Sequence, residues 1–270
     1  MAERKTSRYT EMVLACNEDQ QYTGEKVLDD HALVRIVSGE LKVVQADRTY
    51  TFGPGGTLLF PRNQLSTLIK NAKDGRPYRS VVIKLATSQL REYYSKNNLS
   101  QLQPQSHGIF PLGKSPLLDS FFASVIPYFE LENKLPAQLL SIKIEEAIVI
   151  LRSISKDVDG ILADFSEPGK INLADFMEKN YMFNISLKKF SALTGRSLTT
   201  FKRDFQKTFH TTPQKWLTQK RLELAHYQLS QKQRKPVEVY YETGFENLSH
   251  FSYAFKKHFG YAPTRLIQDK

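Results

Sequence analysis

The chain has 270 residues, 40% of them hydrophobic, and this size and composition allow two domains with separate cores. The formal net charge is +10, and Cys16, the only cysteine, excludes an intrachain disulfide framework. The start at residues 1–5 lacks the apolar core of a signal peptide, and no apolar run approaches membrane-spanning length, so we expect a cytoplasmic protein that does not enter a membrane.

The first part of the chain is typical of antiparallel β-structure. Short apolar runs occur at 33–37, 40–44, 49–52 and 57–61, and strands are expected over 31–62 and 78–86. Turn residues at 38–39, 47–48 and 53–56 separate the runs at short spacing. This pattern predicts a β-sandwich or barrel over about 10–100.

The histidines give little support for a metal centre. His31 stands alone in a predicted strand, and His107 lies in a segment rich in proline and glutamine. Too few ligands converge to hold a metal ion. We therefore expect no metal, no cofactor and no catalytic residues, and we interpret His31 as a residue at a strand edge.

Two helices are expected after the strands, at about 115–129 and 136–163. The second is apolar on more than one face, from Leu139 to Leu162. Such a helix either packs against the barrel or meets a partner helix, so a homodimer through 136–163 and simple burial both remain open. The segment 166–170, which contains Pro168 and Gly169, then predicts an interdomain linker.

An internal repeat dominates the last hundred residues. Three phenylalanines, a lysine and a proline recur in the same order fifty positions on: Phe201, Phe205, Lys207, Phe209 and Pro213, then Phe251, Phe255, Lys257, Phe259 and Pro263. The spacing of the aromatics predicts one apolar stripe on each of two helices, which begin after capping residues Ser197 and Asn247. With a glycine turn and a short amphipathic helix upstream, each copy predicts a helix-turn-helix unit. Two copies are too few for a solenoid.

The polar faces of the two repeated helices suit a groove lined by phosphates, because they combine cations with short hydrogen-bonding side chains. Acidic residues are nearly absent from them, with Asp204 the exception. The candidate DNA-binding residues are Arg196, Thr199, Thr200, Lys202, Arg203, Gln206 and Lys207 in the first copy, and Ser249, His250, Ser252, Tyr253, Lys256 and Lys257 in the second.

The charge distribution supports this interpretation. Residues 171–270 contain 17 lysines and arginines against 8 acidic residues, a net charge of +9, which leaves +1 for the first 170 residues. A basic surplus concentrated in the repeat region indicates a nucleic acid as the partner of the C-terminal part.

Two motifs support a specific family. A linker pattern follows the first repeat, with Pro213, Trp216, Leu217, Arg221, Leu222, Ala225 and Leu229. A closing signature ends the second, with Gly244, Phe245, Phe251, Phe255, Lys256, Lys257, Gly260 and Pro263. On these motifs, residues 171–266 resemble the DNA-binding domain of the AraC/XylS family of transcription regulators. The order of strands and turns before them also resembles the cupin-like sensor domain found at the N-terminus of many such regulators.

The resemblance implies that both recognition helices enter successive major grooves on one face of double-stranded DNA, roughly 34 Å apart, and that the 213–229 helix holds them. Base contacts are then expected from Thr199, Lys202 and Arg203 in the first groove and from Ser249, His250 and Ser252 in the second. Phosphate contacts are expected from Lys207, Lys256 and Lys257. An arginine common in the second recognition helix is Tyr253 here, and a single hydroxyl cannot read guanine as a guanidinium does. The second unit is therefore expected to anchor the protein more than it reads sequence.

The predicted fold class is two-domain α+β. A cupin-like β-barrel with following helices occupies 1–165, and an all-α domain of two helix-turn-helix units joined by a long helix occupies 171–270. The predicted function is a DNA-binding transcription regulator, an activator, which responds to a small-molecule effector or a regulatory protein and works with RNA polymerase. The alternative is a cupin-type enzyme or small-molecule-binding protein with a helical appendage. The effector site and the operator do not follow from the sequence.

Overall fold

The structure is a computed structural model, and it describes residues 13–46, 48–97, 108–130, 136–165 and 169–266. The chain divides into two compact units, Met1–Ser166 and Glu167–Lys270. The predicted linker 166–170 spans this division, and its first three residues lie outside the described part. The first unit combines strands with helices and the second is helical, which confirms the two-domain α+β prediction in its coarse form.

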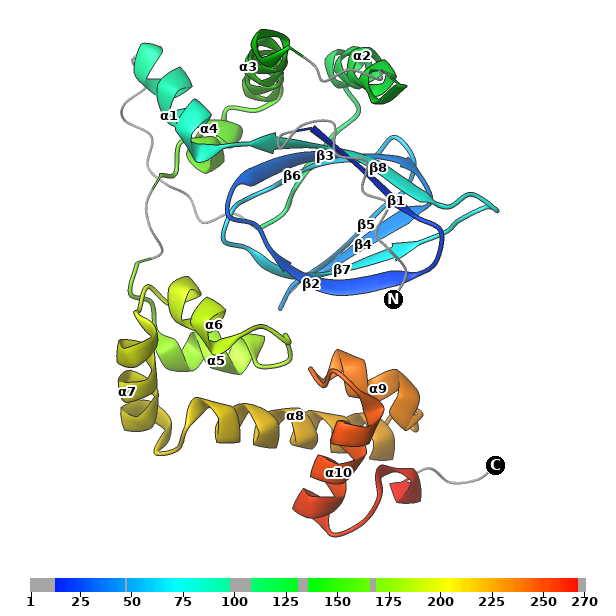
Figure 1. Cartoon of the computed structure of the whole chain (residues 1–270), viewed down its shortest axis with the longest axis vertical. Coiled ribbons are helices and arrows are strands. Elements are labelled where there is room, and N and C mark those ends of the chain that lie inside the picture. Colours follow the sequence, from blue (N-terminus) through cyan, green and yellow to red (C-terminus); the bar gives the residue numbers. More distant parts are fainter. Residues whose placement is uncertain (1–12, 47, 98–107, 131–135, 166–168, 267–270) are drawn as a thin grey trace. The chain divides into compact units, whose positions relative to one another are not determined.

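The strands of the first unit form two antiparallel sheets, which face each other in Figure 1. The five-stranded sheet contains, in spatial order, β1 (Val13–Glu18), β8 (Tyr78–Leu85), β3 (His31–Ser38), β6 (Thr57–Phe60) and β9 (Phe110–Leu112). The four-stranded sheet contains β2 (Tyr22–Val27), β7 (Leu65–Asn71), β4 (Glu40–Val44) and β5 (Thr49–Phe52).

A closed barrel is not found among the described strands, because none from one sheet pairs with a strand of the other. The chain passes between the sheets at Gly39, which alone separates β3 from β4. Gly39 has a φ of +73°, and a Cβ there would lie 2.6 Å from the carbonyl oxygen of Asn71. Only glycine fits such a tight passage with positive φ.

The alternation of side chains along the central strands builds two cores. Ile36 on β3 points between the sheets, where it packs with Val43 and Phe60. Leu33 on the same strand points outward, where it packs with Ile83 and with helical residues. Because β3 is buried on both faces, its sequence is almost continuously apolar rather than alternating.

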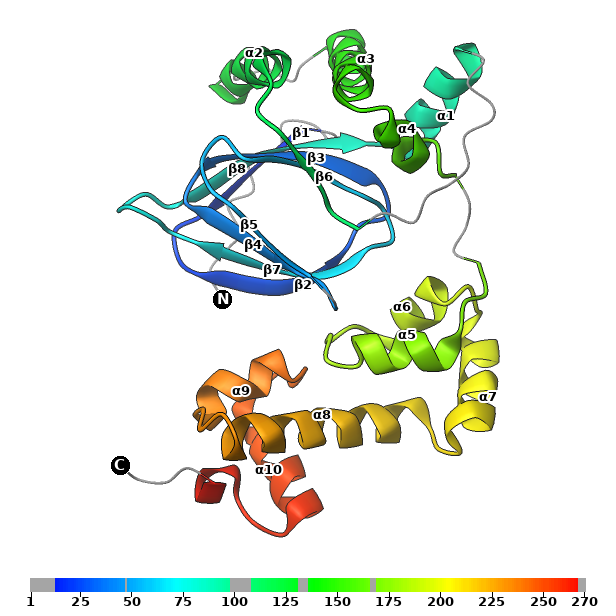
Figure 2. The same cartoon turned by 180° about the vertical axis from the view of Figure 1, so that it is seen from behind.

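Four helices cover the outer face of the five-stranded sheet, as Figures 1 and 2 show from opposite sides. They are α1 (Thr87–Lys96), α2 (Pro116–Val125), α3 (Ala137–Ile154) and α4 (Asp157–Leu162). A 3-10 helix, Ile126–Glu130, extends α2, so the predicted helix at 115–129 is confirmed in outline. The single helix predicted at 136–163 is wrong, because Ser155 is extended, with φ −151° and ψ 133°, and ends α3.

The second unit contains the two predicted helix-turn-helix units. The first consists of α6 (Leu187–Leu193) and α7 (Leu198–Phe209), and the second of α9 (Pro236–Glu242) and α10 (Leu248–Phe259). The long helix α8 (Pro213–Ser230) joins them, in line with the prediction for 213–229. An additional helix, α5 (Leu173–Asn180), precedes the first unit, and a 3-10 helix, Pro263–Leu266, follows the second.

Helix α8 packs against both helix-turn-helix units. Its first half carries Trp216, whose ring centroid lies 5.6 Å from that of Phe205 on α7. Its second half carries Leu222 and Ala225, which pack in one cluster with Phe251 of α10. At 3.6 residues per turn, these two residues lie on roughly the opposite face of α8 from Trp216. One rigid helix therefore contributes to the cores of both units.

Candidate nucleic-acid interface

Helices α7 and α10 present matching buried faces. Phe201 and Phe205 are fully buried on α7, and Phe251 and Phe255 are fully buried on α10. The predicted caps are confirmed, because Ser197 Oγ accepts a hydrogen bond from Thr200 N and Asn247 Oδ1 accepts one from His250 N. The apolar stripe and the cap fix which side of each helix faces solvent.

The exposed face of α7 carries most of the residues proposed for the first unit. The exposed members are Thr199, Lys202, Arg203, Gln206 and Lys207, and Thr200 is half-buried. The side chain of Arg203 is 66% exposed, and its Nε lies 3.7 Å from Asp204 Oδ1. This arrangement leaves the planar fork of Arg203 accessible to a base edge.

Arg196 differs from the other residues of the first-unit set. Its side chain is only 7% exposed, and its Nε donates to Asp204 Oδ2 over 3.1 Å. Its Nη1 donates to the carbonyl oxygens of Ile171 and Thr194. Arg196 thus fastens the segment before α5 to the turn before α7, and its guanidinium is not presented on the polar face.

Asp204 forms ion pairs with two cationic side chains behind α7. The hydrogen bond from Arg196, followed by one from Lys170, holds the pKa of the Asp204 carboxyl below its ordinary value. The one acidic residue on the predicted face therefore neutralises Arg196 and Lys170. It adds little negative potential toward a phosphate backbone.

Helix α10 presents the second set, with a different chemistry. Ser249, His250, Lys256 and Lys257 are exposed, and Ser252 is half-buried. Tyr253, at the position that corresponds to Arg203, is 67% exposed. The cations of α10 gather in its last turn, whereas α7 carries Lys202 and Arg203 in its middle. The two faces are therefore not equivalent.

Sequence reasoning missed one further pair of exposed positions. Leu198 and Leu248 are the first residues of α7 and α10, in the same register of the repeat, and are 36% and 38% exposed. An apolar side chain at this place can contact a thymine methyl group in the major groove. Their fifty-residue spacing is visible in the sequence.

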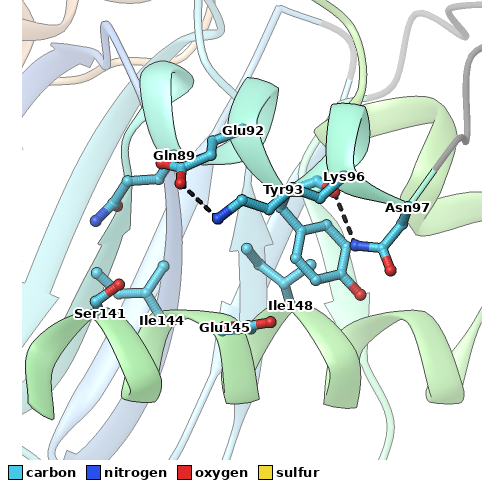
Figure 3. Close-up of a pocket in the computed structure, with 9 residues that line it drawn as sticks. All are labelled: Gln89, Glu92, Tyr93, Lys96, Asn97, Ser141, Ile144, Glu145 and Ile148. Atoms are coloured by element: carbon cyan, nitrogen blue, oxygen red, sulfur yellow. Dashed lines mark hydrogen bonds and ion pairs between the residues drawn. The ribbon is translucent and has the colours of Figure 1, made fainter. Parts of the chain in front are cut away.

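The N-terminal compact unit, Met1–Ser166, contains a pocket between α1 and α3, shown in Figure 3. Two contacts join residues of its lining: Lys96 Nζ lies 2.6 Å from Glu92 Oε1, and Asn97 Nδ2 donates to the carbonyl oxygen of Tyr93.

His31, the histidine weighed as a metal ligand, is the first residue of β3 and is 2% exposed. Its Nδ1 accepts a hydrogen bond from Arg62 N, and burial, followed by the charge of Arg62, lowers its pKa to about 4. His107 lies outside the described residues. Within the described part of the chain, no group of three or more His, Cys, Asp or Glu side chains could hold a metal ion. In the same part, no helix is long and apolar enough to cross a membrane.

Two family descriptions match the chain. Residues 31–159 match the ExsA N-terminal regulatory domain, and residues 190–269 match a helix-turn-helix domain. The chain is 27% identical to the HTH-type transcriptional regulator ExsA of Pseudomonas aeruginosa, over 91% of this chain and 88% of that protein. It is 24% identical to the virulence regulon transcriptional activator VirF of Yersinia enterocolitica, over 85% and 86%.

A crystal structure of an apo ToxT variant from Vibrio cholerae is also similar, with a TM-score of 0.46 and 12% sequence identity. The match covers 95% of this chain and 97% of that chain.

Proposed function

Because the chain belongs to the AraC/XylS family of transcription regulators, we propose that it activates transcription by placing α7 and α10 in two successive major grooves of double-stranded DNA. The observation that carries this proposal is the duplicated register: each helix buries two phenylalanines and turns a polar face that carries lysines outward. The names of relatives such as VirF, a transcriptional activator, support activation rather than repression.

The contacts divide by chemistry. Thr199, Lys202 and Arg203 read base edges in the first groove, and Ser249, His250 and Ser252 read them in the second. Lys207, Lys256 and Lys257 bind phosphates. Thr200, Gln206 and Tyr253 complete the surface. Arg196 supports the first unit from behind, because its guanidinium is committed to Asp204 and to backbone carbonyls.

The two units contribute unequally. Arg203 offers a guanidinium fork that matches the two acceptors of guanine, whereas Tyr253 offers one hydroxyl and a ring. The last turn of α10 carries Lys256, Lys257 and His258, which suits the phosphate backbone. The first helix-turn-helix unit is accordingly the main reader of sequence, and the second is mainly an anchor.

The N-terminal compact unit, which we assign to a cupin-like regulatory domain over 1–165, controls the response. Ile36, Val43, Phe52, Phe60 and Tyr78 form a packed apolar cluster between its sheets. Such packing favours regulation through the surface of the domain, by a protein partner or by self-association, over a small-molecule effector held between the sheets. Action on DNA places the protein in the cytoplasm, with RNA polymerase as a partner, and assigns it no enzymatic role.

Self-association would use the outer face of α3. Five apolar residues of this helix, from Ile144 to Leu151, are buried, but Ile142 and Val149 are 55% and 50% exposed. They lie seven residues apart, about two turns, and so share one face. Sedimentation of the full chain should show a dimer that Ile142→Glu converts to a monomer, while Thr51→Glu, at an exposed position of β5 in the other sheet, leaves it intact. A wild-type monomer at high concentration would refute the dimer.

Fluorescence anisotropy with duplex DNA at several salt concentrations tests the DNA-binding mechanism. Neutralised phosphates release counterions, so the affinity should fall steeply as the salt concentration rises. An affinity that does not change with salt would overturn the proposal and favour the alternative of a cupin-type binding protein or enzyme.

A further inference from the structure

The two helix-turn-helix units meet at the middle of α8, around one arginine. Arg221 Nε donates to the carbonyl oxygen of Tyr181 over 2.9 Å, and its Nη2 donates to that of Phe183 over 2.7 Å. Both carbonyls belong to the loop between α5 and α6, on the side of the first unit. The third nitrogen, Nη1, donates over 3.0 Å to the carbonyl oxygen of Gly244, in the turn between α9 and α10.

The backbones of the two units also approach each other directly at this point. Gly244 has a φ of +85°, and a Cβ built on it would lie 2.8 Å from the carbonyl oxygen of Met182 and 2.7 Å from Arg221 Nε. The turn of the second unit is therefore held against the loop of the first, with the guanidinium between them. Any rotation of one unit about α8 would break at least one of the three hydrogen bonds.

We propose that Arg221 is a positioning residue that fixes the separation and the relative orientation of α7 and α10, and so restricts the protein to one spacing between its two half-sites. The inference rests on the proposed reading of two grooves. A guanidinium suits the task because it is planar, permanently charged and rich in donors, so one side chain can hold three carbonyl oxygens in a fixed arrangement. A lysine ammonium keeps the charge but cannot span these carbonyls in the same plane.

The spacing matters because DNA is helical. One inserted base pair moves the second half-site by about 3.4 Å and rotates it by roughly 35° about the helix axis. A rigid pair of recognition helices cannot follow that change without losing contacts in one groove. A pair joined only by a flexible junction could follow it.

The experiment uses the full-length protein and a duplex of about 40 base pairs that the wild type selects from a randomised library. Two matched duplexes carry one base pair inserted or deleted between the two half-sites. A third duplex carries one half-site alone. The wild type should lose about tenfold or more in affinity with either spacing change. Arg221→Met and Arg221→Lys should lose less than about threefold, with unchanged affinity for the single half-site.

Lys220→Met is the matched control, because Lys220 neighbours Arg221 on α8 and pairs with Glu178 of α5 over 3.0 Å. This variant should keep the spacing penalty of the wild type. If Arg221→Met and Arg221→Lys also keep that penalty while they melt as the wild type does, the inference is overturned.

A second measurement does not depend on DNA. Spin labels at Thr208→Cys on α7 and His258→Cys on α10, with Cys16 replaced by serine, report the distance between the recognition helices. The distribution of distances between the two labels should be narrow with Arg221 present and clearly broader in Arg221→Lys. Equal widths in the two proteins would refute the positioning role. Failure of the wild type to bind duplex DNA would instead contradict the proposed function, without affecting the distance result.

Discussion

The guanidinium of Arg196 donates to the carboxylate of Asp204 over 3.1 Å, eight residues further along the chain and behind the reading face of α7. Arg196 is buried and Arg203 is exposed, although both belong to the candidate DNA-binding residues of the first copy of the repeat. Their substitutions should therefore have opposite effects on stability and on recognition.

Arg196→Ala should destabilise the DNA-binding unit by about 2 kcal/mol, because it removes the hydrogen bonds to the carbonyls of Ile171 and Thr194 as well as the ion pair. Thermal unfolding followed by circular dichroism measures the loss. The ratio of affinities for selected and random duplexes should stay at the wild-type value. A large fall in that ratio, with unchanged stability, would place Arg196 on the DNA instead.

Arg203→Ala should cost roughly 1–3 kcal/mol of binding free energy on the selected duplex and much less on random DNA, because a base contact is lost. Competition binding with both duplexes gives the two values. Its melting temperature should match the wild type, since the side chain is largely exposed. Equal losses on both duplexes would show that Arg203 binds only the backbone.

Lys257→Ala should weaken binding to every sequence and reduce the salt slope by about one, as expected for one lost phosphate contact. The slope comes from affinities measured at several salt concentrations. The control is Lys96→Ala. Lys96 lies in the N-terminal compact unit and pairs with Glu92, so its loss should leave the salt slope unchanged. An unchanged slope for Lys257→Ala would remove it from the interface.

Gly244→Ala should be far more damaging than Gly260→Ala. The two glycines have nearly equal φ values, +85° and +83°, but a Cβ at Gly260 would meet open space. We expect about 1 kcal/mol of destabilisation at Gly260, from backbone conformation alone, and about 2 kcal/mol or more beyond that at Gly244. Denaturant unfolding measures both. Similar losses would mean that the close approach to Met182 costs nothing.

The N-terminal compact unit should lose stability in mild acid because of His31. Its pKa is lowered to about 4 in the folded state, so the unfolded chain takes up a proton first as the pH falls below about 6.5. The stability that the folded state gains by keeping His31 neutral is complete above that pH and is lost as the pH falls toward 4. In His31→Asn, whose Oδ1 can accept the bond from Arg62 N, the decline of the melting temperature between pH 6.5 and 4 should be shallower. Parallel curves would refute this assignment.

The repeat could be predicted from the sequence because its signals are local. The four-residue spacing of Phe201, Phe205 and Phe209 predicts the buried stripe, and Ser197 directly precedes the helix that it caps. The same features recur in α10. Periodicity and capping act within a few residues, so they survive without knowledge of the fold.

Other features could not be predicted, because their causes are distant in the sequence. Helix α1 was missed: the carboxylate that accepts from Thr87 N at its start belongs to Asp30, 57 residues away. Arg196 was placed among DNA contacts because charge alone does not reveal burial. Arg221 was seen only as part of a linker motif, since its acceptors lie 23 to 40 residues away. Whether the strands close a barrel also depends on pairings that no local pattern contains.

Hydroxyl-radical footprinting of the full-length protein on its selected duplex tests the central claim most directly. Two helices held by α8 should protect two patches on one face of the DNA, roughly ten base pairs apart, and Arg203→Ala should weaken the patch of the first unit more than the other. A single protected patch, or protection spread without phase along the duplex, would contradict the reading of two successive grooves.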